Sequence, residues 1–333
     1  MGKFWLPLQF LRFPHLNSSG IIFLLSVVLL VAIASKIPIS LASAMETNSP
    51  ESVSSPSNAS KERFSARQQK ILADLATADV VYLGEIHTQA RDHQAQLAIL
   101  KALHRQNPQI AIAMEMFQLP YQNALDRYIR GEIDESQLRE QTEYQQRWGY
   151  DWAYYAPILR YARKYQLNAI ALNVPTETIR RVATSGWPGL TSQDKQWLPP
   201  RSEIRTDYPQ YRERLREIFN GMHAEYNSSG KFEFFFLAQL LWDETMAANI
   251  AKFATQNPEY QVVVLAGSGH IANRYGIPNR VARRMKAADF THKSVLLSSP
   301  PGDTNVSPAS DSQVNSTMAD YIWHNPSTPR TSE

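Results

Sequence analysis

Short apolar runs alternate with longer amphipathic segments through the middle of the chain. The runs are Val80–Leu83, Ile110–Met114, Ala169–Leu172, Val262–Leu265 and Val295–Leu297. Each run is too short for a helix and lacks the strict alternation of a half-exposed strand. This pattern is typical of strands that are buried on both faces, as in a parallel sheet.

The segments between these runs have helical periodicity, most clearly at 89–105, 208–225 and 232–256. Strands that alternate with long helices favour a parallel sheet covered on both faces. The stretch between Asn173 and Val262 is too long for a single crossover. The pattern therefore predicts an α/β fold with a mostly parallel sheet flanked by helices on both faces. It also predicts a helical insertion between the third and fourth core strands.

The amino terminus has the order of a secretory signal. Lys3 and Arg12 precede an apolar run of 14 residues at 21–34, and the small-x-small sequence Ala42-Ser43-Ala44 follows. The run is shorter than the about 20 residues of a bilayer-spanning helix. We therefore expect residues 1–44 to be a signal peptide or, if uncleaved, a signal anchor. Either outcome predicts an exported protein, periplasmic or membrane-associated through residues 21–34.

Composition divides the rest of the chain. Residues 45–63 are rich in Ser, Pro and Asn, which predicts a disordered linker. A single α/β domain is expected at 64–299, followed by a disordered loop at 300–317 and a disordered tail at 326–333.

The formal charge of +3 comes from the amino terminus. Lys3, Arg12 and Lys36 lie in the first 44 residues, and removing them from the 34 basic residues leaves 31, equal to the 31 acidic residues. A neutral remainder without a long basic run predicts no nucleic-acid partner. The absence of cysteine excludes disulfides, thiolate metal sites and a lipid-modified cysteine.

Polar residues follow the apolar runs directly. Glu85 and His87 follow the first run, Glu115 the second, Asn173 the third and His270 the fourth, and both histidines end a Gly-x-x-His sequence. In an open parallel sheet, ligands bind beyond the carboxyl ends of the strands, so these residues are expected in one crevice. Two imidazoles and two carboxylates there can bind a divalent or ferric metal, or act as acid and base. The alternative is that they are hydrogen-bonded structural residues.

Three further polar residues are candidates for a supporting role. His93 lies about one helical turn after His87. Asp243 and Glu244 fall on otherwise apolar helical stripes, and an unpaired buried carboxylate would cost several kcal/mol. Each must therefore pair either with an arginine or with the polar site.

Two other regions offer groups to a flat ligand. The aromatic segment from Trp148 to Tyr165 is interpreted as core packing, because several of its tyrosines keep helical spacing. His223 and Tyr226 lie in the predicted insertion, and an imidazole or phenolate there could bind ferric iron. Spacing alone does not distinguish these two residues from solvated surface residues.

Five ordered motifs between Val80 and Val295 resemble the ChaN family of haem-binding, iron-regulated proteins. The motifs are Leu83–His87, Met114–Phe117, Ala171–Pro175, Gln239–Ala247 and Ala266–Ile271. The resemblance implies haem binding at the surface of a homodimer and a role in haem or iron uptake, with His223 and Tyr226 as candidate iron ligands. It also implies a closing strand at 318–325.

The same motifs are similar to those of Tiki-type metalloproteases and erythromycin-esterase-like hydrolases. That resemblance implies a metal site formed by Glu85, His87, Glu115 and His270, where a divalent metal activates water and a glutamate acts as base. The sequence therefore leaves an exported haem-binding protein, a metal-dependent hydrolase and a scaffold with a vestigial site as alternatives.

Overall fold

The computed structural model describes three parts of the chain: residues 64–222, 229–297 and 318–324. The predicted signal segment, the linker, the loop after the core and the tail lie outside these parts. Among the helices of the described parts, none is both long enough and apolar enough to cross a bilayer.

Six strands form a single sheet. They are β1 Val80–Glu85, β2 Ile110–Gln118, β3 Asn168–Asn173, β4 Gln261–Gly267, β5 His292–Leu296 and β6 Tyr321–Ile322. Their order is β3-β2-β4-β1-β5-β6, and every neighbouring pair is parallel. The predicted parallel sheet is confirmed, and β6 lies within the segment 318–325.

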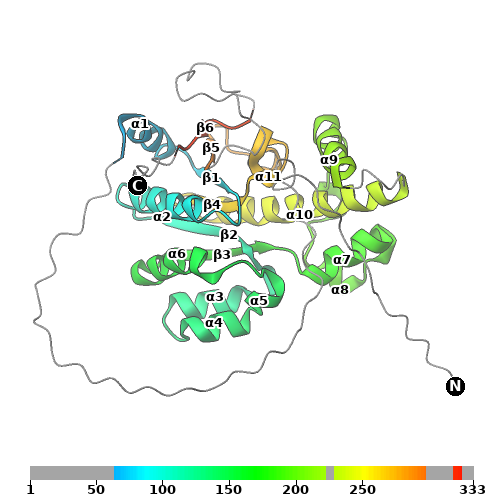
Figure 1. Cartoon of the computed structure of the whole chain (residues 1–333), viewed down its shortest axis with the longest axis horizontal. Helices are drawn as coiled ribbons and strands as arrows, with labels where there is room; N and C mark the ends of the chain where they lie inside the picture. Colours follow the sequence, from blue (N-terminus) through cyan, green and yellow to red (C-terminus); the bar gives the residue numbers. More distant parts are fainter. Residues whose placement is uncertain (1–63, 223–228, 298–317, 325–333) are drawn as a thin grey trace, which may run out of the picture.

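Helices cover both faces of this sheet (Figure 1). Those outside the insertion are α1 Ala66–Leu75, α2 Ala90–His104, η1 Leu119–Tyr121, α3 Gln122–Ile129, α4 Glu135–Gln141, α5 Tyr144–Arg147, α6 Trp152–Tyr165, α11 Ser268–Ile271, η4 Ala272–Arg274 and α12 Ile277–Arg284. The insertion contains α7 Thr176–Ser185, η2 Trp187–Gly189, α8 Ser192–Lys195, η3 Arg201–Glu203, α9 Pro209–Met222 and α10 Ser229–Gln256. The predicted flanking helices and the helical insertion are both confirmed.

Alternate side chains of the strands enter two separate apolar cores. In β1, Val81 and Leu83 face the core formed with α1, α2, α3 and α6, whereas Val80 and Tyr82 face the core formed with α10 and α12. Every residue of β1, β2 and β4 is buried, including the glutamates at Glu85 and Glu115. The absence of strict alternation in the sequence therefore reflects burial on both faces.

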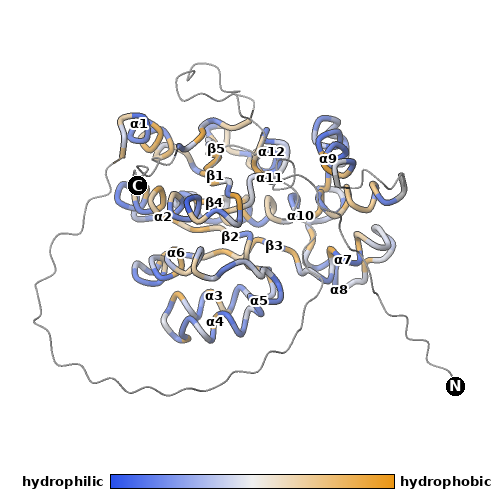
Figure 2. Tube along the Cα trace, in the orientation of Figure 1, coloured by the Kyte–Doolittle hydropathy of each residue, from blue (hydrophilic) through white to orange (hydrophobic). Residues whose placement is uncertain are grey.

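The insertion has apolar clusters of its own. Residues of α7 and of the segments before and after α8 pack on α10 around Val182 and Leu241, and α9 packs on the first half of α10 around Phe219 and Phe236. These helices lie together at one side of the sheet (Figure 1), and most of α9 is coloured hydrophilic in Figure 2. The second half of α10, around Ile250, covers the sheet itself.

Candidate active site

The site lies where three neighbouring strands end. β4 lies between β2 and β1, and Glu85 at the end of β1 is in register with Gly267 at the end of β4. This arrangement brings together the four residues predicted from distant strand ends: Glu85, His87, Glu115 and His270. With Asp243, they form two histidine–carboxylate pairs, His87–Glu85 and His270–Asp243, and Glu115 lies near both histidines.

The first pair joins His87 to Glu85. The Nδ1 atom of His87 lies 2.7 Å from Oε1 of Glu85, and the Tyr155 hydroxyl donates to the same oxygen at 2.6 Å. Gln96 donates to the second carboxylate oxygen at 2.5 Å. Burial alone lowers the pKa of His87, but the hydrogen bond to Glu85 and the charge of Glu115 outweigh it and raise that pKa above its usual value.

The second pair joins His270 to Asp243. The Nδ1 atom of His270 lies 2.6 Å from Oδ1 of Asp243, and the Tyr211 hydroxyl donates to Oδ2 at 2.7 Å. The other imidazole nitrogen of His270 lies 3.4 Å from Oε1 of Glu115. The backbone N–H of Gly267 donates to Oε2 of Glu115 at 2.6 Å, so Glu115 connects the second pair to the end of β4.

Glu115 and His270 carry opposite charges. Burial favours neutral Glu115, but His270, His87 and the Gly267 N–H lower the pKa of Glu115 to about 2. Burial favours neutral His270, but Glu115 and Asp243 raise the pKa of His270 well above its usual value. At neutral pH the site therefore contains an ionised carboxylate beside an imidazolium.

Gly267 is required by close packing against His87. A Cβ atom at position 267 would lie 2.9 Å from both Cε1 and Nε2 of the His87 ring. Any side chain there would displace the imidazole, because carbon atoms in van der Waals contact are about 3.5–4.0 Å apart. The glycine of the second Gly-x-x-His sequence therefore makes room for the histidine of the first.

Aromatic rings cover His87. The rings of Trp148 and Tyr150 each lie with centroids 4.8 Å from that of His87, which is only 4% exposed. The two residues belong to the segment 143–150, which contains α5 and is called the α5 segment below. The interpretation of this region as core packing fits Tyr155, but it missed the contacts of Trp148 and Tyr150 with the site.

Arg147 attaches the α5 segment to Glu177 and Gln118, which lie outside this segment. Arg147 forms ion pairs with Glu143 at 2.9 Å and Glu177 at 3.1 Å, and donates to Gln118 at 3.0 Å. The backbone has positive φ at both ends of the helix, 49° at Glu143 and 77° at Gly149. A short helix bounded by two left-handed residues signals a sharp change of chain direction.

The predicted supporting residues have three different positions. His93 lies 3.1 Å from the backbone oxygen of His87 and 3.4 Å from Glu85, and stacks on Tyr154, so it orients the first pair. Asp243 is part of the second pair. Asn173 is buried at the end of β3, and within the described parts of the chain its Oδ1 has no hydrogen-bond partner.

Glu244 belongs to a separate charge cluster. It is fully buried and accepts from Arg283 at 2.8 Å and from Arg284 at 2.6 Å, with Arg280 at 3.4 Å. Its carboxylate also accepts the backbone N–H of Arg205 at 3.1 Å. The sequence left two kinds of partner open for these carboxylates. Asp243 pairs with His270 of the polar site, and Glu244 pairs with the arginines of α12.

The predicted metal site does not fit the observed geometry. In the described residues, no group of three or more His, Asp or Glu side chains is arranged to hold a metal ion. Each histidine directs Nδ1 to a carboxylate, and Nε2 of His87 packs against Gly267. The four residues Glu85, His87, Glu115 and His270 are therefore not assigned as metal ligands.

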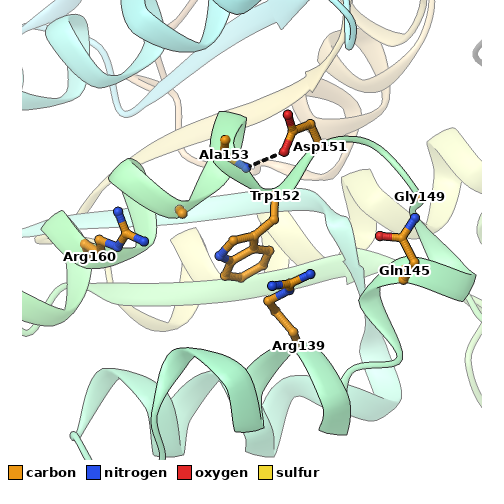
Figure 3. A pocket seen from close by; sticks show the side chains of 8 residues that line it. Arg139, Gln145, Gly149, Asp151, Trp152, Ala153 and Arg160 are labelled. Atoms are coloured by element: carbon orange, nitrogen blue, oxygen red, sulfur yellow. Dashed lines mark hydrogen bonds between the residues drawn. The ribbon is translucent and has the colours of Figure 1, made fainter. Parts of the chain in front are cut away.

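The predicted haem ligands His223 and Tyr226 lie outside the described residues, between α9 and α10. A surface hollow of about 590 Å³ lies elsewhere, between α4, α5 and α6 (Figure 3). Figure 3 shows the guanidinium of Arg139 beside the indole of Trp152. None of the residues of the two histidine–carboxylate pairs lines this hollow.

The fold and the site define a class: α/β proteins with a parallel sheet and paired histidines and carboxylates at its carboxyl edge. A family model described as haem-binding uptake, Tiki superfamily, ChaN matches residues 71–281. This chain belongs to that family, as its motifs predicted.

One solved structure shares the fold, and a second is similar at a lower score. The structure describing cofacial haem binding to ChaN of Campylobacter jejuni is 20% identical, with a TM-score of 0.57 over 76% of this chain and 90% of that chain. A mutant of erythromycin esterase EreC in its open conformation is 13% identical, with a TM-score of 0.44 over 71% of this chain and 74% of that chain.

A curated relative is Protein RETICULATA-RELATED 5, chloroplastic, of Arabidopsis thaliana. It is 24% identical over 275 residues, which are 79% of this chain. The chain spans only 36% of the length of that relative.

Proposed function

We propose that this protein binds haem and serves in haem or iron uptake outside the cytoplasm. The observation that carries the proposal is the family match over residues 71–281, which includes strands β1 to β4 and the whole helical insertion. The amino-terminal sequence, with its basic residues, apolar run and small-x-small site, supports export.

The hairpin of α9 and α10 has surface chemistry that suits haem. Phe234 is 37% exposed, although large apolar side chains are usually buried. Arg212 and Arg216 lie against the ring of buried Phe232 on the side of α10 that faces α9, whereas Phe234 lies beside Gly186. Exposed phenyl groups suit the macrocycle and arginines suit its two carboxylates. In this proposal His223 and Tyr226, between the two helices, bind the iron.

We further propose that haem is held between two copies of the chain. The related ChaN of Campylobacter jejuni binds haem cofacially. Two hairpins that meet face to face would bury their exposed phenyl groups and both macrocycles, which supplies a hydrophobic driving force for a homodimer.

Titration of the full-length chain with hemin in mild detergent tests this proposal. We expect a Soret shift that saturates near one haem per chain, that is lost in Tyr226→Phe or His223→Ala, and that is retained in the control variant His87→Ala. A shift that never saturates would contradict haem binding. Loss in His87→Ala with retention in both hairpin variants would move the haem to the strand-end site.

A second candidate function is hydrolysis by acid–base catalysis without a metal. The observation that favours it is the pair of imidazoles, each oriented by its own carboxylate. In this scheme the α5 segment opens to admit water and the ester, Nε2 of His87 takes a proton from the water, the water oxygen attacks the ester carbonyl, and His270 gives a proton to the leaving alcohol. The carboxylates Glu85 and Asp243 keep each ring in the required orientation.

Hydrolysis of an aryl ester in the presence of a metal chelator tests the second candidate. We expect turnover that falls at least about a hundredfold in His87→Ala and in His270→Ala. The control is His104→Ala, a partly buried histidine of α2 that bonds to Tyr161 far from the strand ends. Equal turnover in all three variants would exclude catalysis at this site.

A further inference from the structure

A polar pocket separate from the candidate active site lies between the insertion and α12. It has a volume of about 190 Å³ and is called the arginine pocket below. Its lining residues are Arg205, Asp207, Tyr208, Glu244, Asn279, Arg280 and Arg283. Three guanidinium groups thus face two carboxylates, so the lining has an excess of positive charge.

The carboxylate of Glu244 does not satisfy all of this positive charge. Its oxygens already accept from Arg283, Arg284 and the backbone of Arg205. Arg280 is 2% exposed, and its Nε has no hydrogen-bond partner among the described residues, although Glu244 lies 3.4 Å away. A buried cation with an unused donor favours a further anion.

The electrostatics of Arg283 agree with this excess. Burial lowers the pKa of Arg283, and the neighbouring arginines at 284, 280 and 205 lower it further against the opposing effect of Glu244. Like charges thus raise the free energy of one another at this position, and a bound anion would relieve that repulsion.

We infer that the arginine pocket binds a small oxyanion of the phosphate type, either free phosphate or a phosphomonoester. Guanidinium groups present planar pairs of donors that match phosphate oxygens. Asn279 and Tyr208 add neutral donors in the same lining. The volume suits a phosphate group and excludes a macrocycle, so this site is separate from the proposed haem site.

The pocket is in contact with the active-site network. The guanidinium of Arg280 stacks on the ring of Tyr211 at 4.2 Å, and the Tyr211 hydroxyl donates to Asp243. Asp243 in turn orients His270. A phosphate group bound at Arg280 would therefore be linked to His270 through Tyr211 and Asp243.

Calorimetric titration of the full-length chain with inorganic phosphate tests this inference. Arg205 is the residue to change, because among the described residues its side chain is paired with exposed Asp207, while its backbone makes the bond to Glu244. We expect one saturable site, with roughly tenfold weaker binding in Arg205→Ala. Asp207→Asn should bind several-fold more tightly, since it releases Arg205 from a competing carboxylate.

The matched control is Arg130→Ala. Arg130 pairs with Glu132 two residues later, as Arg205 pairs with Asp207, and its side chain is 52% exposed against 55% for Arg205. Phosphate affinity should be unchanged in this control. Absence of saturable heat, an equal loss in Arg130→Ala, or tighter binding of acetate than of phosphate would each overturn the inference. A phosphomonoester that binds more tightly than phosphate would support it and identify the larger ligand. None of these outcomes depends on haem binding.

Discussion

Asp243 and Glu244 are consecutive residues of α10, and both carboxylates are buried. Successive helical residues point in directions about 100° apart. Asp243 therefore reaches the carboxyl edge of the sheet and His270, while Glu244 reaches the arginines of α12. Each carboxylate offsets the cost of its burial by pairing with a different set of charges. Asp243 thus supports the site, and Glu244 joins α10 to α12.

The pH dependence of stability is a prediction at the scale of single residues. The folded pKa of Glu115 is about 2, below its usual 4.5, so its contribution is complete above pH 4.5 and is lost as the pH falls towards 2. The pKa of His270 is raised above 6.5, so its contribution is complete below pH 6.5 and is lost as the pH rises through the raised value. Glu115 and His270 together should therefore stabilise the fold most between pH 4.5 and pH 6.5.

Glu115→Gln should remove this dependence on the acid side. The lowered pKa of Glu115 corresponds to a contribution on the order of 3 kcal/mol above pH 4.5. Urea unfolding of both proteins over a pH series measures the difference in unfolding free energy. Parallel pH profiles for wild type and variant would contradict the assignment of an ionised Glu115 beside His270.

Among the elements, the α5 segment controls access to His87. Its rings cover the imidazole, and Arg147 holds it through a partly exposed ion pair with Glu177 and a hydrogen bond to Gln118. Exposed ion pairs are individually weak, typically about 0–1 kcal/mol each. The cover is therefore held less firmly than the sheet beneath it, which is buried on both faces.

Arg147→Ala should make the α5 segment open more often. We expect amide hydrogen exchange at residues 144–149 to accelerate roughly tenfold, with β1 and β4 unchanged. The control is Arg214→Ala, which breaks an ion pair with Glu217 on α9, in the helical insertion. Similar acceleration in both variants would show that the segment responds to general loosening and not to its own ion pairs.

At the scale of the whole molecule, the chain has a sheet with two cores and an insertion with its own apolar clusters. The two histidine–carboxylate pairs lie at the sheet, whereas the proposed haem surface lies on the α9–α10 hairpin. Long helix α10 joins them, since it contributes Phe234 to the hairpin and Asp243 to the site. The hairpin and the site are also connected by the hydrogen bond from Tyr211 of α9 to Asp243.

Haem-dependent dimerisation is the prediction at this scale. Sedimentation of the full-length chain should show a doubling of mass on haem saturation, and Phe234→Asp should prevent it by placing charge on the apolar hairpin surface. The control is Tyr165→Asp, since Tyr165 is 46% exposed on α6, away from the insertion. A dimer in the absence of haem that Phe234→Asp leaves intact would place the contact elsewhere.

The sequence by itself determined the strands, the flanking helices, the insertion and the polar strand ends, because burial on both faces leaves a readable pattern of short apolar runs. The family motifs in the same runs determined the ChaN relationship. The strand order was decided only by tertiary packing, which puts β4 between β1 and β2 and so brings Glu115 to both histidines. Packing also placed Trp148 over His87 and turned each Nδ1 towards a carboxylate, which removes the ligand geometry that residue types alone suggested for a metal. Periodicity along a chain encodes how deeply a residue is buried, whereas the direction of its hydrogen bonds depends on neighbours that are distant in sequence.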